Sequence, residues 1–229
     1  MTSNSEKYKA KKRHALNLGR LCLVLAVVGL VSIIILFKNY TLSLVENRDE
    51  MTKYEHFILP VVMMDPVPFD SIQTADGQFI KQAAMWSTLL GDDRDKYAYD
   101  ENGMLLVPAT DLDVSAHKLF GEQASITHET FDDYEATYLF DPDIAAYRVP
   151  TVAKVSYSPY VESIDKTIPD KLVLKVGYVA PGNVFTTKAE DKKEGIKPDK
   201  YMFYDLVKTK DGMYISAIRD IDITAPPKS

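Results

Sequence analysis

Residues 201–221 read YMFYDLVKTKDGMYISAIRDI. Two β-rich segments, 201–207 and 213–221, flank the sequence Lys210-Asp211-Gly212. Asp-Gly between two such segments is a strong signal for a tight turn that joins antiparallel strands. This stretch therefore predicts a β-hairpin near the end of the chain.

The preceding residues extend this sheet. Residues 171–179, KLVLKVGYV, alternate apolar and polar side chains, as a strand with one buried face does. Further upstream, residues 134–140 and 147–157 are β-rich and flank the turn-forming Asp141-Pro142-Asp143. The second half of the chain therefore predicts an antiparallel sheet.

Helical periodicity comes before the strands. Apolar residues recur at steps of three and four from Ile72 to Leu90, with Asp70 or Ser71 as the expected cap and Gly91 as the expected end. A short strand, 104–108, is followed by a second predicted helix over 111–120. Helices first and strands afterwards predict an α+β fold, with the helices packed on one face of a curved antiparallel sheet.

The segment before this domain is predicted to be a spacer. Residues 41–59 have a short apolar stripe at helical spacing, and Pro60 is expected to end that helix. Residues 60–69 contain three prolines and are expected to be extended. We therefore assign 38–69 to a stalk and connector, 70–223 to the α+β domain and 224–229 to a C-terminal tail.

An uncharged apolar run, LCLVLAVVGLVSIIILF, occupies residues 21–37. As a helix it would extend about 25 Å, and the flanking Arg20 and Lys38 can reach the membrane surfaces. Residues 1–20 form a basic tail that contains six Lys and Arg and one Glu. The run therefore predicts one transmembrane helix, with the N-terminus in the cytoplasm and the C-terminal domain outside the cytoplasm.

A cleaved signal peptide is the alternative interpretation of this run. The run is longer than the usual apolar core of such signals, and the residues that follow it, Lys38-Asn39-Tyr40-Thr41, make a poor cleavage site. The sequence thus favours an uncleaved anchor and localisation to the cell membrane as a single-pass protein.

The charge and the cysteine content of the chain argue against a nucleic-acid partner and against a disulfide in the outer domain. The chain has a net charge of −6, and because its basic tail carries +5, the remaining 209 residues carry −11. An acidic domain lacks the basic face that nucleic acids require, so no nucleic-acid partner is expected. The single cysteine, Cys22, lies in the apolar run, so the domain contains no disulfide.

No catalytic, cofactor or metal motif is present in the sequence. The four histidines do not have the spacing of metal ligands, and no Gly-rich phosphate loop or nucleophile motif occurs. The acidic segment 92–101 fails the EF-hand pattern, because its sixth and twelfth positions from Asp93 are Ala98 and Met104. We therefore predict a protein that is not an enzyme and that uses no cofactor.

Aromatic residues are the remaining candidates for a site. The sequence has 14 Tyr and nine Phe, and a helix laid across a curved sheet often leaves a hollow. Core packing, a protein interface and a small-molecule pocket are the three alternatives for these side chains. The candidates for lining a pocket or an interface are Phe79, Trp86, Tyr178, Phe203, Tyr204 and Tyr214.

The order of predicted elements is a long helix over 72–90, a strand over 104–108, a short helix over 111–120 and several antiparallel strands. This order resembles the cystatin-like, nuclear-transport-factor-like α+β fold. With a basic tail and one span, the whole architecture is similar to the inner-membrane scaffold proteins of type IV secretion and conjugation machines. Bacterial sporulation and envelope-assembly proteins share it. The resemblance implies protein–protein assembly, and no functional residue is carried over from it.

The sequence therefore predicts a non-catalytic envelope protein whose outer domain binds protein partners or a second copy of itself. The alternative is a ligand-sensing or carrier domain with a hydrophobic pocket between helix and sheet. An enzyme with a dispersed acid site is a third possibility, and it would require two buried carboxylates that face a cleft.

Overall fold

A computed structural model of the 229-residue chain describes residues 48–221 except 135, 152, 153, 155, 185–196 and 211, together with Gly29 and Ser32. The chain divides into two compact units, Met1–Glu50 and Met51–Ser229. The second unit holds nearly all of the described residues. In the first, Gly29, Ser32 and residues 48–50 are helical.

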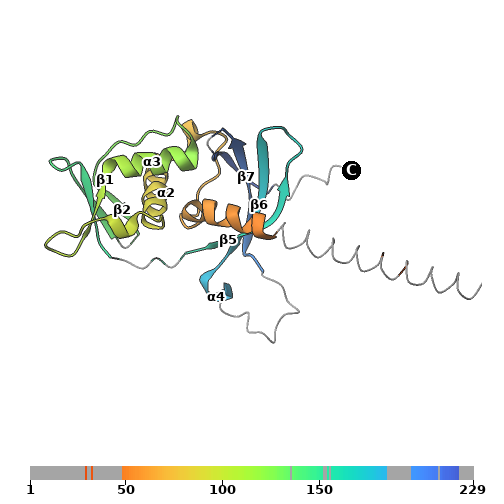
Figure 1. Cartoon of the computed structure of the whole chain (residues 1–229), viewed down its shortest axis with the longest axis horizontal. Coiled ribbons are helices and arrows are strands. Elements are labelled where there is room, and N and C mark those ends of the chain that lie inside the picture. Colours follow the sequence, from red (N-terminus) through yellow and green to blue (C-terminus); the bar gives the residue numbers. More distant parts are fainter. Residues whose placement is uncertain are drawn as a thin grey trace, which may run out of the picture. The chain divides into compact units, whose positions relative to one another are not determined.

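The second unit begins with helical residues 51–62, and the described residues after them form further helices and eight strands (Figure 1). The remaining elements, in chain order, are η1 (Ile72–Thr74), α2 (Gly77–Leu89), η2 (Arg94–Lys96), β1 (Leu105–Pro108), α3 (Ala109–Phe120), β2 (Phe131–Asp133), β3 (Ala136–Asp141), β4 (Ala146–Val149), β5 (Ser158–Asp165), β6 (Lys171–Val179), α4 (Pro181–Val184), β7 (Lys200–Lys208) and β8 (Met213–Asp220).

The strands form two four-stranded antiparallel sheets. The first has the order β1-β4-β3-β2, and the second has the order β5-β6-β7-β8. The α+β class is confirmed, with helices packed against antiparallel sheets. The strands are, however, divided between two sheets, whereas the sequence predicted one curved sheet.

The second sheet follows the alternation of its sequence. Leu174, Tyr204 and Ile218 are aligned across β6, β7 and β8, and all three are fully buried. The next aligned row, Lys175, Phe203 and Arg219, faces the opposite side and is half-buried to exposed. Because strand side chains alternate between faces, this register places the apolar set against the core and the charged set toward water. The predicted hairpin of β7 and β8 is confirmed.

Helices α2 and α3 pack against each other, and α3 also contacts β1 and β8. In Figure 1 both helices lie beside β1 and β2. The apolar stripe of α3, which includes Leu112, Ala116 and Leu119, is buried. Gly121 ends α3 with a φ of +83°, a conformation that glycine adopts without steric cost. This end of α3 agrees with the sequence prediction.

The start of the long predicted helix was wrong. Ile72 belongs to the separate helix η1, the chain becomes extended at Ala75, and α2 begins at Gly77. Asp76, and neither Asp70 nor Ser71, caps α2: its carboxylate accepts a hydrogen bond of 3.0 Å from the backbone N–H of Gln78. A carboxylate next to Gly is a favourable N-cap, and it divides the apolar pattern into two helices.

Residues 51–69, assigned to the stalk and connector from sequence, contribute to the core of the domain. Tyr54, Ile58 and Val61 are buried in the same cluster as the second sheet. The helix does not end at Pro60 but continues to residue 62. Proline removes only one N–H donor, and in the last turn this loss leaves the other hydrogen bonds in place.

Among the residues that the structure describes, no helix is both long enough and apolar enough to cross a membrane. The predicted span over residues 21–37 lies outside the described residues, apart from Gly29 and Ser32.

Candidate functional site

The six aromatic residues predicted from the sequence do not converge on one cavity. Tyr178 and Tyr204, on neighbouring strands β6 and β7, are fully buried, and their hydroxyl oxygens are 2.6 Å apart. Burial raises the pKa of both hydroxyls, so both keep their protons at neutral pH. These two side chains fill the core of the second sheet.

Phe79 and Trp86 lie on α2 and are also in the core. The Phe79 ring packs against Phe69 and Phe120, with ring centroids 6.0 and 5.7 Å away. Trp86 is 8% exposed, and its indole N–H donates to the Asp133 carboxylate at 2.6 Å. Both residues thus stabilise the fold around α2.

Phe203 and Tyr214 occupy the surface side of the second sheet. The Phe203 ring lies 5.7 Å from the Arg219 guanidinium, in cation–π geometry. The Tyr214 ring packs on the backbone of Gly121, where an added Cβ would lie 3.1 Å from the ring. Of the six predicted residues, only Tyr214 lines the groove described next.

This groove has a volume of about 1170 Å³ and lies between η1, the C-terminal end of α3 and the β7–β8 hairpin. Its apolar surface includes Val114, which is 64% exposed, and the half-buried Met213. The full lining is Phe57, Asp70, Ser71, Ile72, Gln73, Val114, His117, Lys118, Phe120, Gly121, Glu122, Gln123, Lys171, Asp205, Val207, Thr209, Gly212, Met213, Tyr214, Ser216 and Ala217.

Charges of both signs surround the groove. Asp70, Glu122 and Asp205 are acidic, and Lys118 and Lys171 are basic. The Asp205 carboxylate is paired with Arg219 at 2.5 Å. Among the described residues, no group of three or more His, Cys, Asp or Glu side chains is placed to hold a metal ion.

No known protein-family model, curated protein or solved structure matches this chain significantly. The chemistry of the domain therefore has to be inferred from its own residues.

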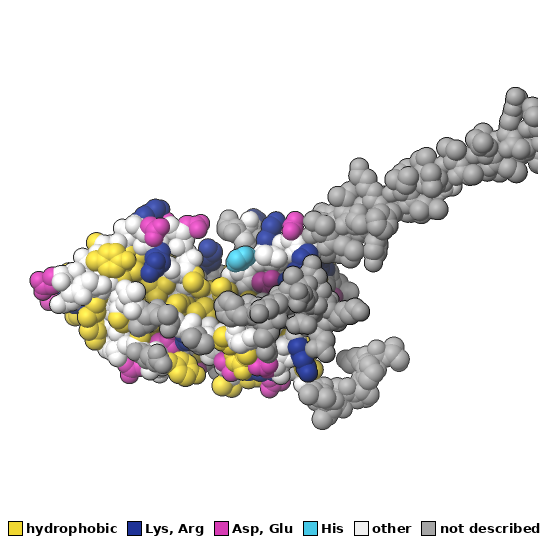
Figure 2. Space-filling model, turned by 90° about the horizontal axis from the view of Figure 1, so that it is seen from below, with side chains coloured by type: hydrophobic (Ala, Val, Ile, Leu, Met, Phe, Trp, Pro, Cys, Tyr) yellow, Lys and Arg dark blue, Asp and Glu magenta, His cyan; other side chains and the backbone are white. Residues whose placement is uncertain are grey.

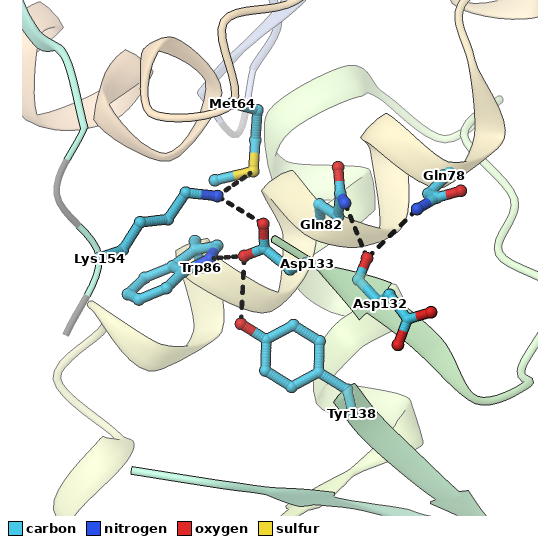
Figure 3. A network of polar contacts seen from close by, with 8 residues as sticks. All are labelled: Met64, Gln78, Gln82, Trp86, Asp132, Asp133, Tyr138 and Lys154. Carbon is cyan, nitrogen blue, oxygen red and sulfur yellow. Dashed lines mark hydrogen bonds and ion pairs between the residues drawn. The ribbon is translucent and has the colours of Figure 1, made fainter. Parts of the chain in front are cut away.

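The most buried charged residue in the part of the chain that the structure describes, Asp133, lies outside the groove lining, in the network of Figure 3. The Asp133 side chain is 1% exposed, and its carboxylate accepts from Lys154 at 2.5 Å and from the Trp86 indole. The Tyr138 hydroxyl donates to the same carboxylate at 3.3 Å, and burial raises the pKa of Tyr138. Every oxygen of Asp133 has a donor, so the network links the segments that carry these side chains.

The Lys154 ammonium also lies 3.4 Å from the sulfur of Met64. Lys154 belongs to the segment between β4 and β5, Asp133 to the first sheet and Met64 to the chain that follows the first helix. The Lys154 ammonium thus links three segments of the domain that are distant in sequence. The contact between Lys154 and Asp133 could not be predicted from the sequence, because the two residues are 21 positions apart and share no motif.

The groove was also missed by sequence reasoning. Residues distant in sequence form its lining: Gln73 and Gln123 both line the groove, and their side chains are hydrogen-bonded to each other across 50 positions of sequence. Figure 2 shows another face of the domain, seen from below Figure 1, where hydrophobic side chains also lie among acidic and basic ones. A surface of mixed apolar and charged groups is typical of protein interfaces.

Proposed function

We propose that this chain is a non-catalytic, membrane-anchored envelope protein whose α+β domain binds a protein partner in the groove beside Tyr214. The observation that carries the proposal is the groove itself, which combines large volume with a mixed lining.

The size of the groove favours a polypeptide. Pockets for small molecules usually enclose about 300–1,000 Å³ and bury most of the ligand. The groove is larger, at about 1170 Å³, and exposed residues such as Val114 and Lys118 form its rim. Apolar contacts inside a rim of charged and amide groups are the usual composition of a protein interface.

The alternative of a ligand carrier has less support. It depended on a hollow lined by aromatic side chains between helix and sheet, and four of the six candidate side chains are instead packed in the core. An enzyme is also less well supported. It would require two buried carboxylates that face a cleft, and the buried Asp133 carboxylate is instead paired with the Lys154 ammonium.

The membrane anchor and the kind of assembly are parts of the same proposal. The apolar run over 21–37 supports an anchor, with the domain outside the cytoplasm. The antiparallel order β5-β6-β7-β8, with residues 51–62 packed in its core, supports a cystatin-like, nuclear-transport-factor-like domain. Such an architecture favours a role in a secretion, conjugation or envelope complex.

Site-specific photo-crosslinking of the full-length protein in intact cells tests the proposal. A photoreactive residue at Val114, which is 64% exposed in the groove, is expected to capture one or a few discrete proteins. The matched control is Ile144, which is 51% exposed and lies outside the groove, and it is expected to capture none of them.

Capture of a second copy of the chain from Val114 supports the homo-oligomeric form of the proposal. Equal crosslinking from Val114 and Ile144, or lipid-sized adducts alone, would contradict a protein-docking role for the groove.

A further inference from the structure

The floor of the groove is formed by two rows of side chains on the outer face of the second sheet. Lys171, Val207 and Tyr214 are aligned across β6, β7 and β8, and all three line the groove. Asp205 and Ala217 form the second row and line it as well. Because side chains alternate along a strand, this face is opposite to the buried apolar row of the sheet.

The register of the strands also places Asp70, which lines the groove at its edge. Phe69 forms an antiparallel bridge with Ile218 on the outer edge of β8. In antiparallel pairing the residue after Phe69 lies beside the residue before Ile218, so Asp70 lies beside Ala217. Asp70 is therefore one strand spacing beyond β8, whereas Lys171 is two strand spacings behind it, on β6.

This placement gives the separation of the two charged residues. Asp70 and Lys171 are three strand spacings apart across the sheet, about 14 Å, and three residues apart along β8, from Tyr214 to Ala217, about 10 Å. The diagonal is about 17 Å, a distance that an extended chain covers in about five residues. The two charges thus mark opposite corners of the groove floor.

Both corner charges are available to a ligand. Lys171 and Asp70 are exposed, and in the part of the chain that the structure describes neither side chain has a hydrogen bond or an ion pair. The carboxylate of Asp205, which lies between them, is instead paired with Arg219. A ligand that is complementary to this floor therefore carries one charge of each sign, at opposite ends of the segment that lies on it.

The volume of the groove distinguishes an extended segment from a helix. An extended segment of about 17 Å, taken as about 4.8 Å wide and 10 Å deep, occupies about 800 Å³. A helix of the same length, with a diameter of about 10–12 Å, occupies about 1,300–1,900 Å³. The groove encloses about 1170 Å³, so the extended segment fits inside it and the helix does not.

We propose that the groove binds an extended segment of a partner protein that places a basic side chain at Asp70 and an acidic side chain about five residues away, at Lys171. Apolar side chains between these two charges pack on Val207, Tyr214 and the exposed Val114. This inference rests on the proposed function of the groove and specifies the chemistry of its partner.

Photo-crosslinking from Val114 of the full-length protein in intact cells, repeated with charge reversals, tests the inference. Lys171→Glu and Asp70→Lys should each lower the yield of the captured protein about five- to tenfold, because an attraction is replaced by a repulsion. Lys208→Glu and Asp220→Lys make the same charge changes at exposed residues outside the groove lining, so capture should be retained. Circular dichroism checks that all four variants are folded.

Mass spectrometry of the crosslinked peptide identifies the captured segment. It should contain Lys or Arg and Asp or Glu about five residues apart, with apolar residues between them. Capture that is unchanged in both groove variants, equal losses in the two controls, or a captured segment without this pair of charges would overturn the inference. These results would leave docking itself in place, whereas docking fails if Val114 of the wild type captures no protein.

Discussion

Replacing Lys154 with methionine tests whether the buried ion pair holds the domain together. The change leaves the Asp133 carboxylate, 1% exposed, with its hydrogen bonds from Trp86 and Tyr138 but without a cation. Removing one partner of a buried ion pair costs about 3–5 kcal/mol, because the remaining charge is uncompensated. For a domain of this size, we expect the melting temperature to fall by about 6–20 °C.

Urea unfolding of the full-length protein measures this loss. Trp86 is the single tryptophan of the chain and donates directly to Asp133, so its fluorescence reports the site. Circular dichroism gives the global transition on the same samples. Since the carboxylate and the ammonium act as a pair, Lys154→Met combined with Asp133→Asn should cost less than the sum of the single changes, with a coupling of about 2 kcal/mol.

Lys96→Met is the control. Lys96 also pairs with an aspartate, Asp93, but its side chain is 75% exposed, so its loss should leave the transition unchanged within error. Two results would refute the view that this buried ion pair stabilises the domain. One is a destabilisation of less than about 1 kcal/mol for Lys154→Met, and the other is strict additivity of the free-energy losses of Lys154→Met and Asp133→Asn.

Three further predictions concern the groove wall and the core. Gly121→Ala places a Cβ 3.1 Å from the Tyr214 ring at a φ of +83°, and denaturation should show a loss of about 2–3 kcal/mol. Gly103 also has a positive φ, +74°, but a Cβ added there would have no neighbour within 4 Å. Gly103→Ala should therefore lower the free energy of unfolding by only about 1 kcal/mol. Tyr178→Phe leaves the buried Tyr204 hydroxyl without its partner at 2.6 Å, so we expect a loss of about 1–3 kcal/mol in urea unfolding. Because burial raises the pKa of both tyrosines, stability should be complete below about pH 10 and fall as the pH rises further, measured by tyrosinate absorbance together with circular dichroism.

Each of these predictions has an outcome that would contradict it. Equal losses for the two glycine changes would mean that the Tyr214 contact costs nothing. A Tyr178→Phe/Tyr204→Phe double variant as unstable as the sum of its single changes would show that the two hydroxyls are not coupled. Because exposed tyrosines such as Tyr134 also ionise, a tyrosinate signal before unfolding that is smaller in the Tyr178→Phe variant than in the wild type would show that the Tyr178 hydroxyl is accessible to water.

The fold class could be predicted because local signals and burial agree in the second sheet. The alternation over β6 and the Asp-Gly signal between β7 and β8 can each be recognised from residues that are close in sequence. Leu174, Tyr204 and Ile218, which are aligned and buried, agree with both signals. The end of α3 at Gly121 was predictable for the same reason, since a left-handed terminus favours glycine locally. Signals that span a few residues thus located these elements correctly.

Competing local signals explain the errors in the helices. Asp70, Ser71 and Asp76 all suit an N-cap, and only packing decides that Ile72 belongs to a short separate helix. Pro60 is a helix breaker in isolation, but it is buried, and tertiary packing of Ile58 and Val61 keeps its turn helical. The boundary of the domain was therefore placed too late in the chain.

The candidate site could not be predicted because its parts meet only after folding. Sequence reasoning selected aromatic residues, and burial then placed Tyr178 and Tyr204 in the core and left Tyr214 at the groove. The contacts of His128 could not be predicted either, because its partners Asp113 and Tyr147 are 15 and 19 positions away in sequence and form no known motif with it. Composition can indicate that an interface exists, but only the fold determines which side chains share it.

The location of the groove links binding to the stability of the domain. Its walls come from α3, which packs beside the first sheet, and from β7 and β8 of the second sheet. The same junction is joined by Phe69, whose backbone exchanges hydrogen bonds of 2.8 and 2.9 Å with Ile218 and whose ring packs on Phe79. A partner that contacts both walls binds only the folded junction, so by mass action it stabilises the arrangement that creates its site. Docking and the contacts at the junction are therefore expected to depend on one another.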